Sequence, residues 1–368
     1  MNRTVLLCAH NPKNAGMYSV DLAGKQFFEN RQRKVELCVT QHKNKIGKLS
    51  FKRIRSVSPL TDVDSIVYWG DFQNNPMWGW RDFSRREVGY GDADTHESAF
   101  GFWREFYLEA GKALPESRKL YSVGGCFQGM QDYLDIPGVR EGFEYFLQRA
   151  SAIIVRDSIS YATLTNCFSP KLTRNVKLGY DVSCLLNVES FTINKSDPYF
   201  AWSFGRSGLS PDDEMKIVAY IEMYTGLKAV KIDWLNPKLL FGSRHFFNRP
   251  FMRMLRMISG ARFIVTDIYH MTLNSLNVGT PPLVLYQSQR GSGSFGTLLD
   301  DKKQSLLSML NAGSFLFEWD ESRDVVDNVS PMLRMANMIM ADHEIGDAVL
   351  AAHKQKKQEL ISQLTQIF

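Results

Sequence analysis

The chain has 368 residues, of which 44% are hydrophobic and 23% charged, and its formal net charge is +5. Because this length exceeds what one hydrophobic core usually supports, we expect two domains. The composition excludes a largely disordered chain, and the modest charge predicts no nucleic-acid partner.

Cysteine content and hydropathy point to a reducing compartment. Five cysteines occur without C-x-x-C spacing, which argues against a disulfide framework and a zinc site. The apolar run at 5–9 is too short for a signal peptide, and no segment approaches the about 20 apolar residues of a membrane span. We therefore expect a cytoplasmic protein. Six cations within residues 43–55 form either a solvated face or a peripheral contact with the inner face of a membrane.

Short apolar runs alternate with helical patterns along the whole chain, as in parallel sheets built from strand–helix–strand units. The expected strands are 5–9, 65–69, 119–123 and 152–155 in the first half, and 199–203, 228–232, 263–265 and 283–286 in the second. Expected helices include 143–149, 212–224 and 248–258. This order predicts an α/β fold of two Rossmann-like domains that face each other across a cleft.

A polar segment at 187–198 separates the two sets of strands. We therefore predict domains at 1–188 and 189–340, followed by an amphipathic helix at 341–368 that packs back on the body. The stretch 70–106 carries nine aromatic residues among glycines and charges, and we expect it to be a long functional loop. Asp92 and Asp94 within it form a D-x-D pair, a motif too weak by itself to predict a metal.

In the first half, polar residues follow two predicted strands. The run 152–155 is followed by Arg156, Asp157 and Ser158 before a helical pattern. Either Asp157 or Ser158 caps that helix while Arg156 pairs with a carboxylate, or the group belongs to a site. Asp181 follows a further short strand, where it can hold backbone or act as a base toward a hydroxyl.

In the second half, the segment 261–287 has the order strand, loop, helix, turn, strand. Thr266 and Asp267 can cap its helix, and His270 stands in the first turns, where backbone N–H groups attract phosphate or carboxylate. A structural role for this histidine is the more frequent alternative. Arg206 lies in a glycine-flanked loop after 199–203, and its planar guanidinium suits the same anions.

Five segments of the chain together resemble, in the right order, the polysaccharide pyruvyl transferase family. They are 14–16 (NAG), 155–164 (VRDSISYATL), 179–186 (GYDVSCLL), 266–285 (TDIYHMTLNSLNVGTPPLVL) and 297–310, which contains Asp300 and Lys302. Two positions depart from the family pattern. Met17 stands where an aspartate is usual, and Ile268 stands where an arginine usually precedes the histidine by two places.

The resemblance implies a fold like the type B glycosyltransferases, phosphoenolpyruvate as donor, and a sugar of a cell-surface polysaccharide or lipid-linked oligosaccharide as acceptor. It places the acceptor in the first domain and the donor in the second, and it requires neither cofactor nor metal. It makes His270 the acid or phosphate ligand and Arg206 the anion clamp, with Asp181 or Asp157 on the sugar side. The further substrate-binding residues that we predict are Asn14, Gly16, Arg156, Ser158, Arg244 and Asp267.

The missing arginine keeps alternatives open. Arg206, Arg244 or Arg262 takes its role, or the donor differs from phosphoenolpyruvate. A glycosyltransferase of the same architecture that uses a nucleotide sugar would accommodate the departure, because a diphosphate can rest on a helix N-terminus and loop amides. A catalytically inactive polysaccharide-binding module is the third hypothesis.

Overall fold

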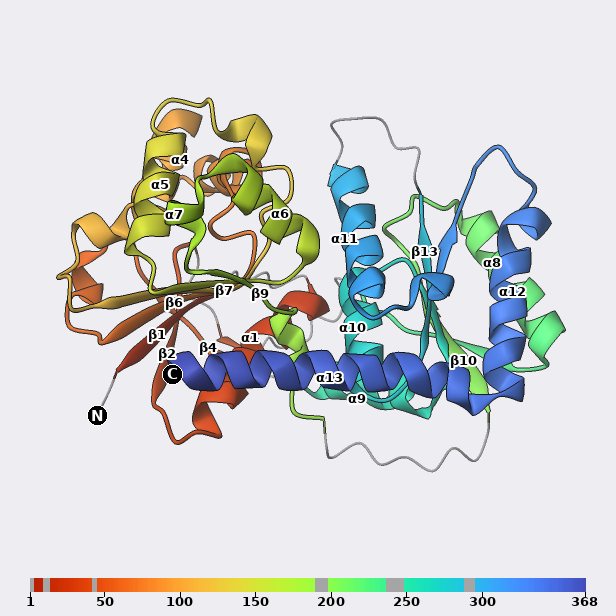
Figure 1. Ribbon diagram of the computed structural model, residues 1–368. Helices are drawn as coiled ribbons and strands as arrows, with labels where there is room; N and C mark the ends of the chain where they lie inside the picture. The colour runs from red at the N-terminus through yellow and green to blue at the C-terminus, as the bar shows by residue number, and fades with distance from the viewer. Residues whose placement is uncertain (1–2, 9–13, 42–44, 189–197, 236–247, 288–294) are drawn as a thin grey trace. The chain divides into compact units, whose positions relative to one another are not determined.

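The computed structural model describes residues 3–8, 14–41, 45–188, 198–235, 248–287 and 295–368 (Figure 1). By contacts the chain divides into two units. The first comprises Met1–Asn11, Met17–Leu186 and Leu360–Phe368, and the second comprises Pro12–Gly16 and Asn187–Glu359.

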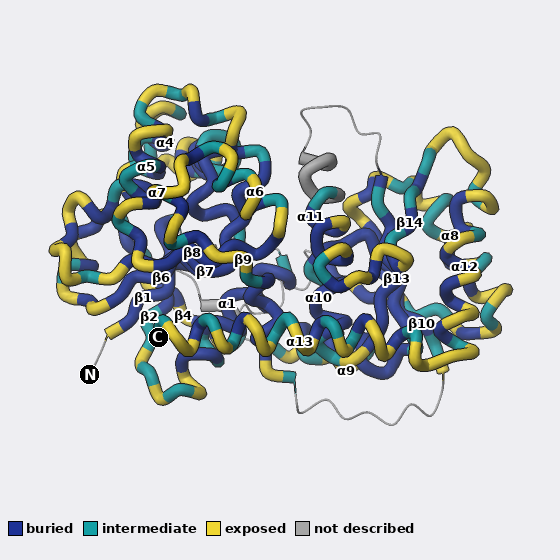
Figure 2. The backbone as a smooth tube through the Cα atoms, viewed as in Figure 1, coloured by how far each residue is buried: buried dark blue, intermediate teal, exposed yellow. Residues whose placement is uncertain are grey.

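The first unit is built on a parallel sheet of seven strands in the order β5-β2-β1-β6-β7-β8-β9. Its central strands are buried along almost all of their length because both faces of the sheet are covered, as Figure 2 shows. The chain order changes direction between β1 and β6, which makes the carboxyl ends of these strands the expected ligand-binding edge. The strands are β1 (Thr4–Cys8), β2 (Val35–Val39), β5 (Lys52–Arg53), β6 (Ser65–Asp71), β7 (Lys119–Gly125), β8 (Ala152–Val155) and β9 (Val176–Leu178), with a small hairpin of β3 (Lys45–Ile46) and β4 (Leu49–Ser50).

Helices cover both faces of this sheet, with α4, α5 and α6 on one side and α1 on the other (Figure 1). Their bounds are α1 (Ala15–Glu29), α2 (Pro76–Trp78), α3 (Ser84–Gly89), α4 (His96–Tyr107), α5 (Val139–Arg149), α6 (Ser158–Cys167) and α7 (Pro170–Thr173), and shorter turns are η1 (Ser58–Leu60), η2 (Gly79–Phe83), η3 (Ala110–Lys112), η4 (Gln131–Tyr133) and η5 (Val182–Leu185).

The aromatic stretch 70–106 is not the irregular loop that we predicted. Most of it is helical, in α2, η2, α3 and α4. Thr95 and Ser98 form a capping box at the start of α4, and Phe100 and Trp103 lie one turn apart on its buried face, with ring centroids 5.2 Å apart. Phe83 and Trp103 are fully buried. The expectation of a long loop is therefore wrong, because helical spacing turns Phe83, Phe100 and Trp103 into the core.

The basic stretch near residue 50 is partly neutralised within the first unit. Three of its cations pair with carboxylates: Lys52 with Glu36, Arg53 with Asp92 and Arg55 with Glu87. These pairs leave less charge for an anionic lipid surface than the sequence alone indicates. Among the described residues, none of the helices is long and apolar enough to cross a membrane, and no group of side chains is arranged to hold a metal ion.

The second unit has a parallel sheet of five strands in the order β11-β10-β12-β13-β14. Figure 1 shows α9, α10 and α11 on one face and α8 and α12 on the other. The chain order reverses between β10 and β12. The elements are β10 (Tyr199–Ser203), α8 (Pro211–Thr225), β11 (Lys228–Lys231), α9 (Asn248–Gly260), β12 (Ile264–Thr266), α10 (Tyr269–Asn277), β13 (Pro282–Tyr286), α11 (Phe295–Met309), η8 (Gly313–Phe315), β14 (Leu316–Glu318) and α12 (Val325–Ala341).

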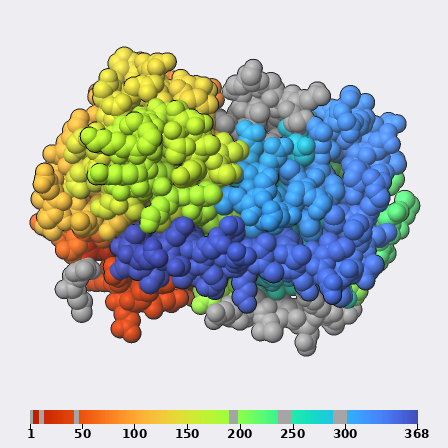
Figure 3. All heavy atoms as spheres, in the orientation of Figure 1, coloured from red at the N-terminus to blue at the C-terminus, as the bar shows by residue number. Residues whose placement is uncertain are grey.

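The last helix, α13 (His343–Ile367), contributes to both units. Its final residues belong to the first, where the Phe368 ring packs on Phe28 and on Tyr121, each with a centroid separation of 4.9 Å. Its outer face is exposed (Figure 3), as an amphipathic pattern predicts. The predicted fold class is confirmed, since the chain forms two α/β units and each contains a parallel sheet.

Candidate active site

In the first unit, a buried guanidinium gathers three carboxylates at the carboxyl edge of the sheet. Pairing of β6, β7 and β8 aligns Asp71 with Gly125 and Gly125 with Val155, the residue before Arg156. The Arg156 guanidinium, with 1% of its side chain exposed, lies 3.4 Å from Asp71, 3.5 Å from Asp181 and 3.6 Å from Asp157. Burial of this cation requires such partners, because an unpaired charge in the interior is strongly destabilising.

Asp157 has the structural role that we weighed for it. Its Oδ1 accepts the backbone N–H of Ser160 at 2.7 Å, which caps α6, and also the side-chain amide of Gln128 at 3.2 Å. The cap and the ion pairs of Arg156 are the contacts that the structural alternative predicted for this segment. Ser158 begins α6 and is exposed.

Asp181 is similarly engaged. It is 2% exposed, and its Oδ1 accepts the backbone N–H of Ser183 at 2.9 Å and the hydroxyl of Ser183 at 2.7 Å. These bonds start the turn η5 at the end of the unit. In this geometry Asp181 and Asp157 hold Arg156 and the local backbone, and both carboxylates are buried.

Asp71 was missed in the sequence. Among the three carboxylates that pair with Arg156 it has the most exposed side chain, 22% against 3% for each of the others. Its backbone is left-handed, with φ of 56°, a conformation that costs a non-glycine residue about 1–3 kcal/mol and that is concentrated at functional sites. The available signal was its position at the end of a buried strand, β6, which lies beside the switch in strand order.

Near this edge, the Asp21 side chain on α1 is buried. Desolvation raises the pKa of its carboxyl well above the usual value; a hydrogen bond with Cys8 opposes this shift, and Asp71 adds to it. Burial thus favours the protonated form of Asp21 over the charged form beside Asp71.

In the second unit, the glycine-flanked loop after β10 is tied down by a carboxylate. Oδ2 of Asp267 accepts the backbone N–H groups of Gly205, Arg206 and Ser207 at 3.1, 2.7 and 2.6 Å, and the Ser207 hydroxyl at 2.6 Å. The prediction that Asp267 caps α10 is wrong: Ile268 occupies the cap position without a side-chain bond to the helix. Asp267 fills a concavity of loop amides that a phosphate could otherwise occupy.

This loop presents Arg206. Its backbone is fixed by Asp267, whereas its side chain is exposed. A guanidinium on a loop held in place by four hydrogen bonds can reach an anion while losing little backbone entropy.

His270 is the second residue of α10, and it follows the carboxyl end of β12 as predicted. It is half-buried, its ring lies edge-on to Tyr269, and its carbonyl accepts the side-chain amide of Asn274 at 2.7 Å. Gly16 belongs to this unit, and a Cβ at Gly16 would overlap the His270 side chain. Asn14 fixes that turn, since its side-chain oxygen accepts the Gly16 N–H at 2.9 Å.

A buried lysine lies behind this helix start. Lys303 on α11, 1% exposed, donates to the carbonyls of Leu285 at 2.7 Å and Asp267 at 3.2 Å. Ile268, where the family pattern has arginine, is 4% exposed. The sequence directed attention to Lys302, whereas Lys303 places its ammonium group next to the peptide that precedes Ile268.

Arg262 and Arg244 were the other cations that we considered as replacements for the arginine that is absent at position 268. Arg262 precedes β12, and its N–H bonds to Tyr199 at the start of β10. It therefore lies at the amino edge of the sheet, opposite to His270, and the hypothesis that it replaces the arginine is wrong. Arg244 lies outside the described residues.

Comparison with known proteins gives a family and a fold. Residues 91–289 match the family model for polysaccharide pyruvyl transferase. Among solved structures, UDP-GlcNAc 2-epimerase from Methanocaldococcus jannaschii is similar with a TM-score of 0.50, 11% identity and 93% coverage of each chain. A putative UDP-N-acetylglucosamine 2-epimerase from Listeria monocytogenes gives 0.49, 12% identity and coverage of 95% of this chain and 91% of the other. No curated protein sequence matches this chain. At these identities the structural likeness concerns the fold alone.

Proposed function

Because this chain belongs to the polysaccharide pyruvyl transferase family and is thus a transferase, we propose that it transfers a pyruvyl group from phosphoenolpyruvate to a sugar. The acceptor sugar belongs to a cell-surface polysaccharide or its precursor, and the product is a pyruvate ketal. The enzyme acts in the cytoplasm, as its cysteine content predicts.

The observation that carries this proposal is the set of groups at the carboxyl edge of the second sheet. Arg206 extends from the loop that Asp267 fixes, His270 stands at the start of α10, and Lys303 adds a buried positive charge behind it. Phosphoenolpyruvate carries a phosphate and a carboxylate, which need cations, and an enol carbon, which needs an acid. The matched range 91–289 includes Arg206 and His270.

In the proposed reaction, His270 gives a proton to the methylene carbon of phosphoenolpyruvate, and positive charge develops on the adjacent carbon. A sugar hydroxyl attacks that carbon and loses its proton to a base. The bond from carbon to phosphate oxygen then breaks, inorganic phosphate leaves, and a second sugar hydroxyl closes the ketal as its own proton is lost. Arg206 stabilises the donor's anionic groups throughout.

We assign the base toward the acceptor hydroxyl to Asp71, in place of Asp157 or Asp181. Those two carboxylates are buried and already bonded to backbone, so in this proposal they position Arg156. Asp71 combines a side chain that solvent reaches with a fixed backbone at the strand end. The ion pair with Arg156 orients the Asp71 carboxylate.

The nucleotide-sugar alternative loses one of its supports. It relied on loop amides to hold a diphosphate, and the amides of Gly205, Arg206 and Ser207 are bonded to Asp267. A phosphate would have to displace this carboxylate from four hydrogen bonds.

The test is release of phosphate from phosphoenolpyruvate, together with the mass gain of the acceptor glycan. His270→Ala should lower the rate by about 100-fold or more, the typical contribution of a general acid, and Asp71→Asn should do the same. His343→Ala is the matched control, since His343 is exposed at the start of α13, and it should retain the wild-type rate. Circular dichroism verifies folding of each variant.

Three results would overturn the proposal. The first is phosphate release by His270→Ala at the rate of His343→Ala. The second is stabilisation of the protein against heat by a nucleotide sugar but not by millimolar phosphoenolpyruvate, which would favour the glycosyltransferase. The third is a fully folded protein that releases no phosphate with any acceptor, which would favour the inactive binding module.

A further inference from the structure

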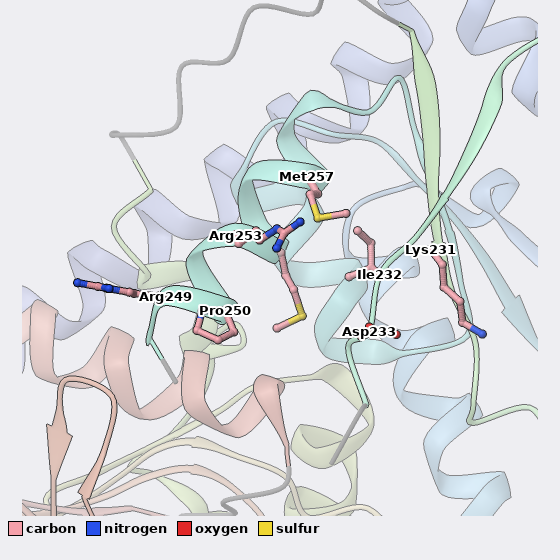
Figure 4. Close-up of a pocket in the computed structure, with 8 residues that line it drawn as sticks. Lys231, Ile232, Asp233, Arg249, Pro250, Arg253 and Met257 are labelled. Carbon is pink, nitrogen blue, oxygen red and sulfur yellow. The ribbon is translucent and has the colours of Figure 1, made fainter. Parts of the chain in front are cut away.

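A cavity of about 460 Å³ opens in the second unit between the end of β11 and the first turns of α9 (Figure 4). Three cations and one carboxylate leave its lining with a net positive charge, and the remaining side chains are apolar. The lining residues are Lys231, Ile232, Asp233, Arg249, Pro250, Arg253, Met254 and Met257.

Two elements build this cavity. From α9, Arg249, Arg253 and Met257 project at intervals of four residues, which places them along one face of the helix. From the sheet, β11 continues into Ile232, whose N–H bonds to the Trp202 carbonyl of β10 at 2.8 Å. Figure 4 shows Arg253 and Met257 directed toward Ile232. The cavity therefore has an apolar floor with a guanidinium at its side.

The mouth carries the other charges. Figure 4 shows Arg249 and Lys231 extending outward on opposite sides of the cavity, with Asp233 near the end of β11. The Lys231 ammonium lies 4.6 Å from the centroid of the Trp202 ring, a cation–π contact that restricts its side chain. Both Arg253 and Asp233 are exposed, so a ligand can reach them.

The cavity is separate from the proposed donor site. β11 is the edge strand of the sheet, and β10 lies between it and β12, the strand that leads to His270. None of the lining residues has a role in the proposed transfer. Its volume falls in the range of about 300–1,000 Å³ that holds drug-sized ligands, whereas inorganic phosphate or phosphoenolpyruvate would fill only part of it.

We propose that this cavity binds a nucleoside phosphate. The planar guanidinium of Arg253 offers paired N–H donors to a phosphate, and Arg249 adds a second cation. Met254, Met257 and Ile232 form a polarisable apolar surface on which a flat base can lie. The Asp233 carboxylate accepts hydrogen bonds from ribose hydroxyls. In strand–helix–strand nucleotide-binding units, an acidic residue after the second strand commonly has this role, and Asp233 follows β10, α8 and β11 in that order.

Isothermal titration of the full chain with UDP and ADP, and separately with inorganic phosphate and phosphoenolpyruvate, tests the proposal. Wild-type protein should bind at least one nucleoside diphosphate more than tenfold more tightly than inorganic phosphate. Arg253→Ala should weaken that binding at least tenfold, because a charge-assisted bidentate contact is lost. Asp233→Asn should weaken nucleotide binding severalfold and leave phosphate binding unchanged.

Arg256→Ala is the matched control. Arg256 is exposed on the same helix and does not line the cavity, so this variant removes the same charge and should bind as the wild type does. Three results would overturn the proposal: no nucleotide binding at millimolar concentration, equal affinity for inorganic phosphate, or equal effects of Arg253→Ala and Arg256→Ala. Because these titrations contain no acceptor and measure binding alone, their outcome is independent of the transfer assay.

Discussion

At the scale of single residues, carboxylates of this chain form hydrogen bonds with groups that lie far away in the sequence. Asp267 was expected to cap the helix that follows it, yet it binds a loop 60 residues earlier in the chain. The physical reason is the number of hydrogen-bond donors. Three convergent backbone N–H groups and a hydroxyl give one carboxylate oxygen more hydrogen bonds than the first turn of a helix does. The spacing of residues along the sequence does not indicate that this loop lies beside Asp267 in the fold.

Asp267→Ala should therefore lower the stability of the second unit. Removal of the carboxylate leaves the N–H groups of Gly205, Arg206 and Ser207 without their acceptor, and we expect a loss of about 3 kcal/mol in the free energy of unfolding. Urea unfolding measures the change. Added acetate should recover part of the loss by occupying the same loop.

Asp324→Ala provides the comparison for that variant. Asp324 occupies the cap position of α12, is exposed, and makes no side-chain bond to the helix, so its replacement should change stability by less than about 0.5 kcal/mol. Equal stabilities of the two variants would contradict the role given to Asp267.

At the scale of helices and strands, the sequence predicted the regular parts well and the short ones poorly. The bounds of β8 and β10 were predicted to the residue. β5 has two residues and β14 has three; neither was predicted, because such short runs show no pattern and only pairing with a neighbouring strand makes them strands. The prediction for the aromatic stretch 70–106 was wrong for a different reason. Its glycines indicated a loop, whereas tertiary packing makes most of it helical.

The candidate site was predictable to a similar extent. His270 and Arg206 follow strands whose ends could be recognised, and the structure places both at the same edge of one sheet. Asp71 and Lys303 could not be found in this way. Asp71 meets Arg156 across 85 residues of sequence, and such contacts depend on strand order, which a single sequence does not specify.

The glycines of the aromatic stretch differ sharply in their surroundings, which gives a prediction at this scale. A Cβ at Gly79, in η2, would overlap the Trp103 ring, and that ring is fixed because its N–H donates to the Gln73 carbonyl at 2.9 Å. Gly79→Ala should therefore lower the free energy of unfolding by about 1–3 kcal/mol. A Cβ at Gly101, inside α4, would meet no side chain within 4 Å.

Gly101→Ala should raise the stability by about 0.5–1 kcal/mol, since alanine loses less backbone entropy than glycine in a helix. Thermal unfolding of the two alanine variants measures both effects. A change of the same sign in both would show that Gly79 does not limit packing around Trp103.

At the scale of the whole molecule, each unit has its own sheet and its own buried core, so each should have its own unfolding transition. The two cores contain ionisable groups of opposite response to acid. Burial raises the pKa of Asp21 in the first unit. In the second unit, burial, with a smaller contribution from Lys357, lowers the pKa of His353 on α13 from 6.5 to about 3.

The signs of these shifts give a pH prediction for each unit. Unfolding lets His353 take up a proton at any pH between about 3 and 6.5, so its contribution to stability is complete above pH 6.5 and is lost as the pH falls. Between pH 6.5 and 5 the second unit should lose about 2 kcal/mol from this group. Asp21 acts in the opposite direction, because folding favours its protonated form. Its contribution to the stability of the first unit decreases as the pH rises above the pKa that Asp21 has in the unfolded chain.

Hydrogen exchange followed by mass spectrometry at pH 6.5 and 5, corrected for the intrinsic exchange rates, reports on the two units separately. His353→Gln should remove most of the acid sensitivity of the second unit and leave that of the first unchanged, while Asp21→Asn should alter the pH dependence of the first alone. The Nε2 of His353 lies 2.9 Å from Oδ1 of Asn277, a bond that holds the neutral ring as a donor. If the second unit of His353→Gln lost as much stability in acid as the wild type, the buried neutral histidine would not be the cause, and the sensitivity would have to arise from surface carboxylates instead.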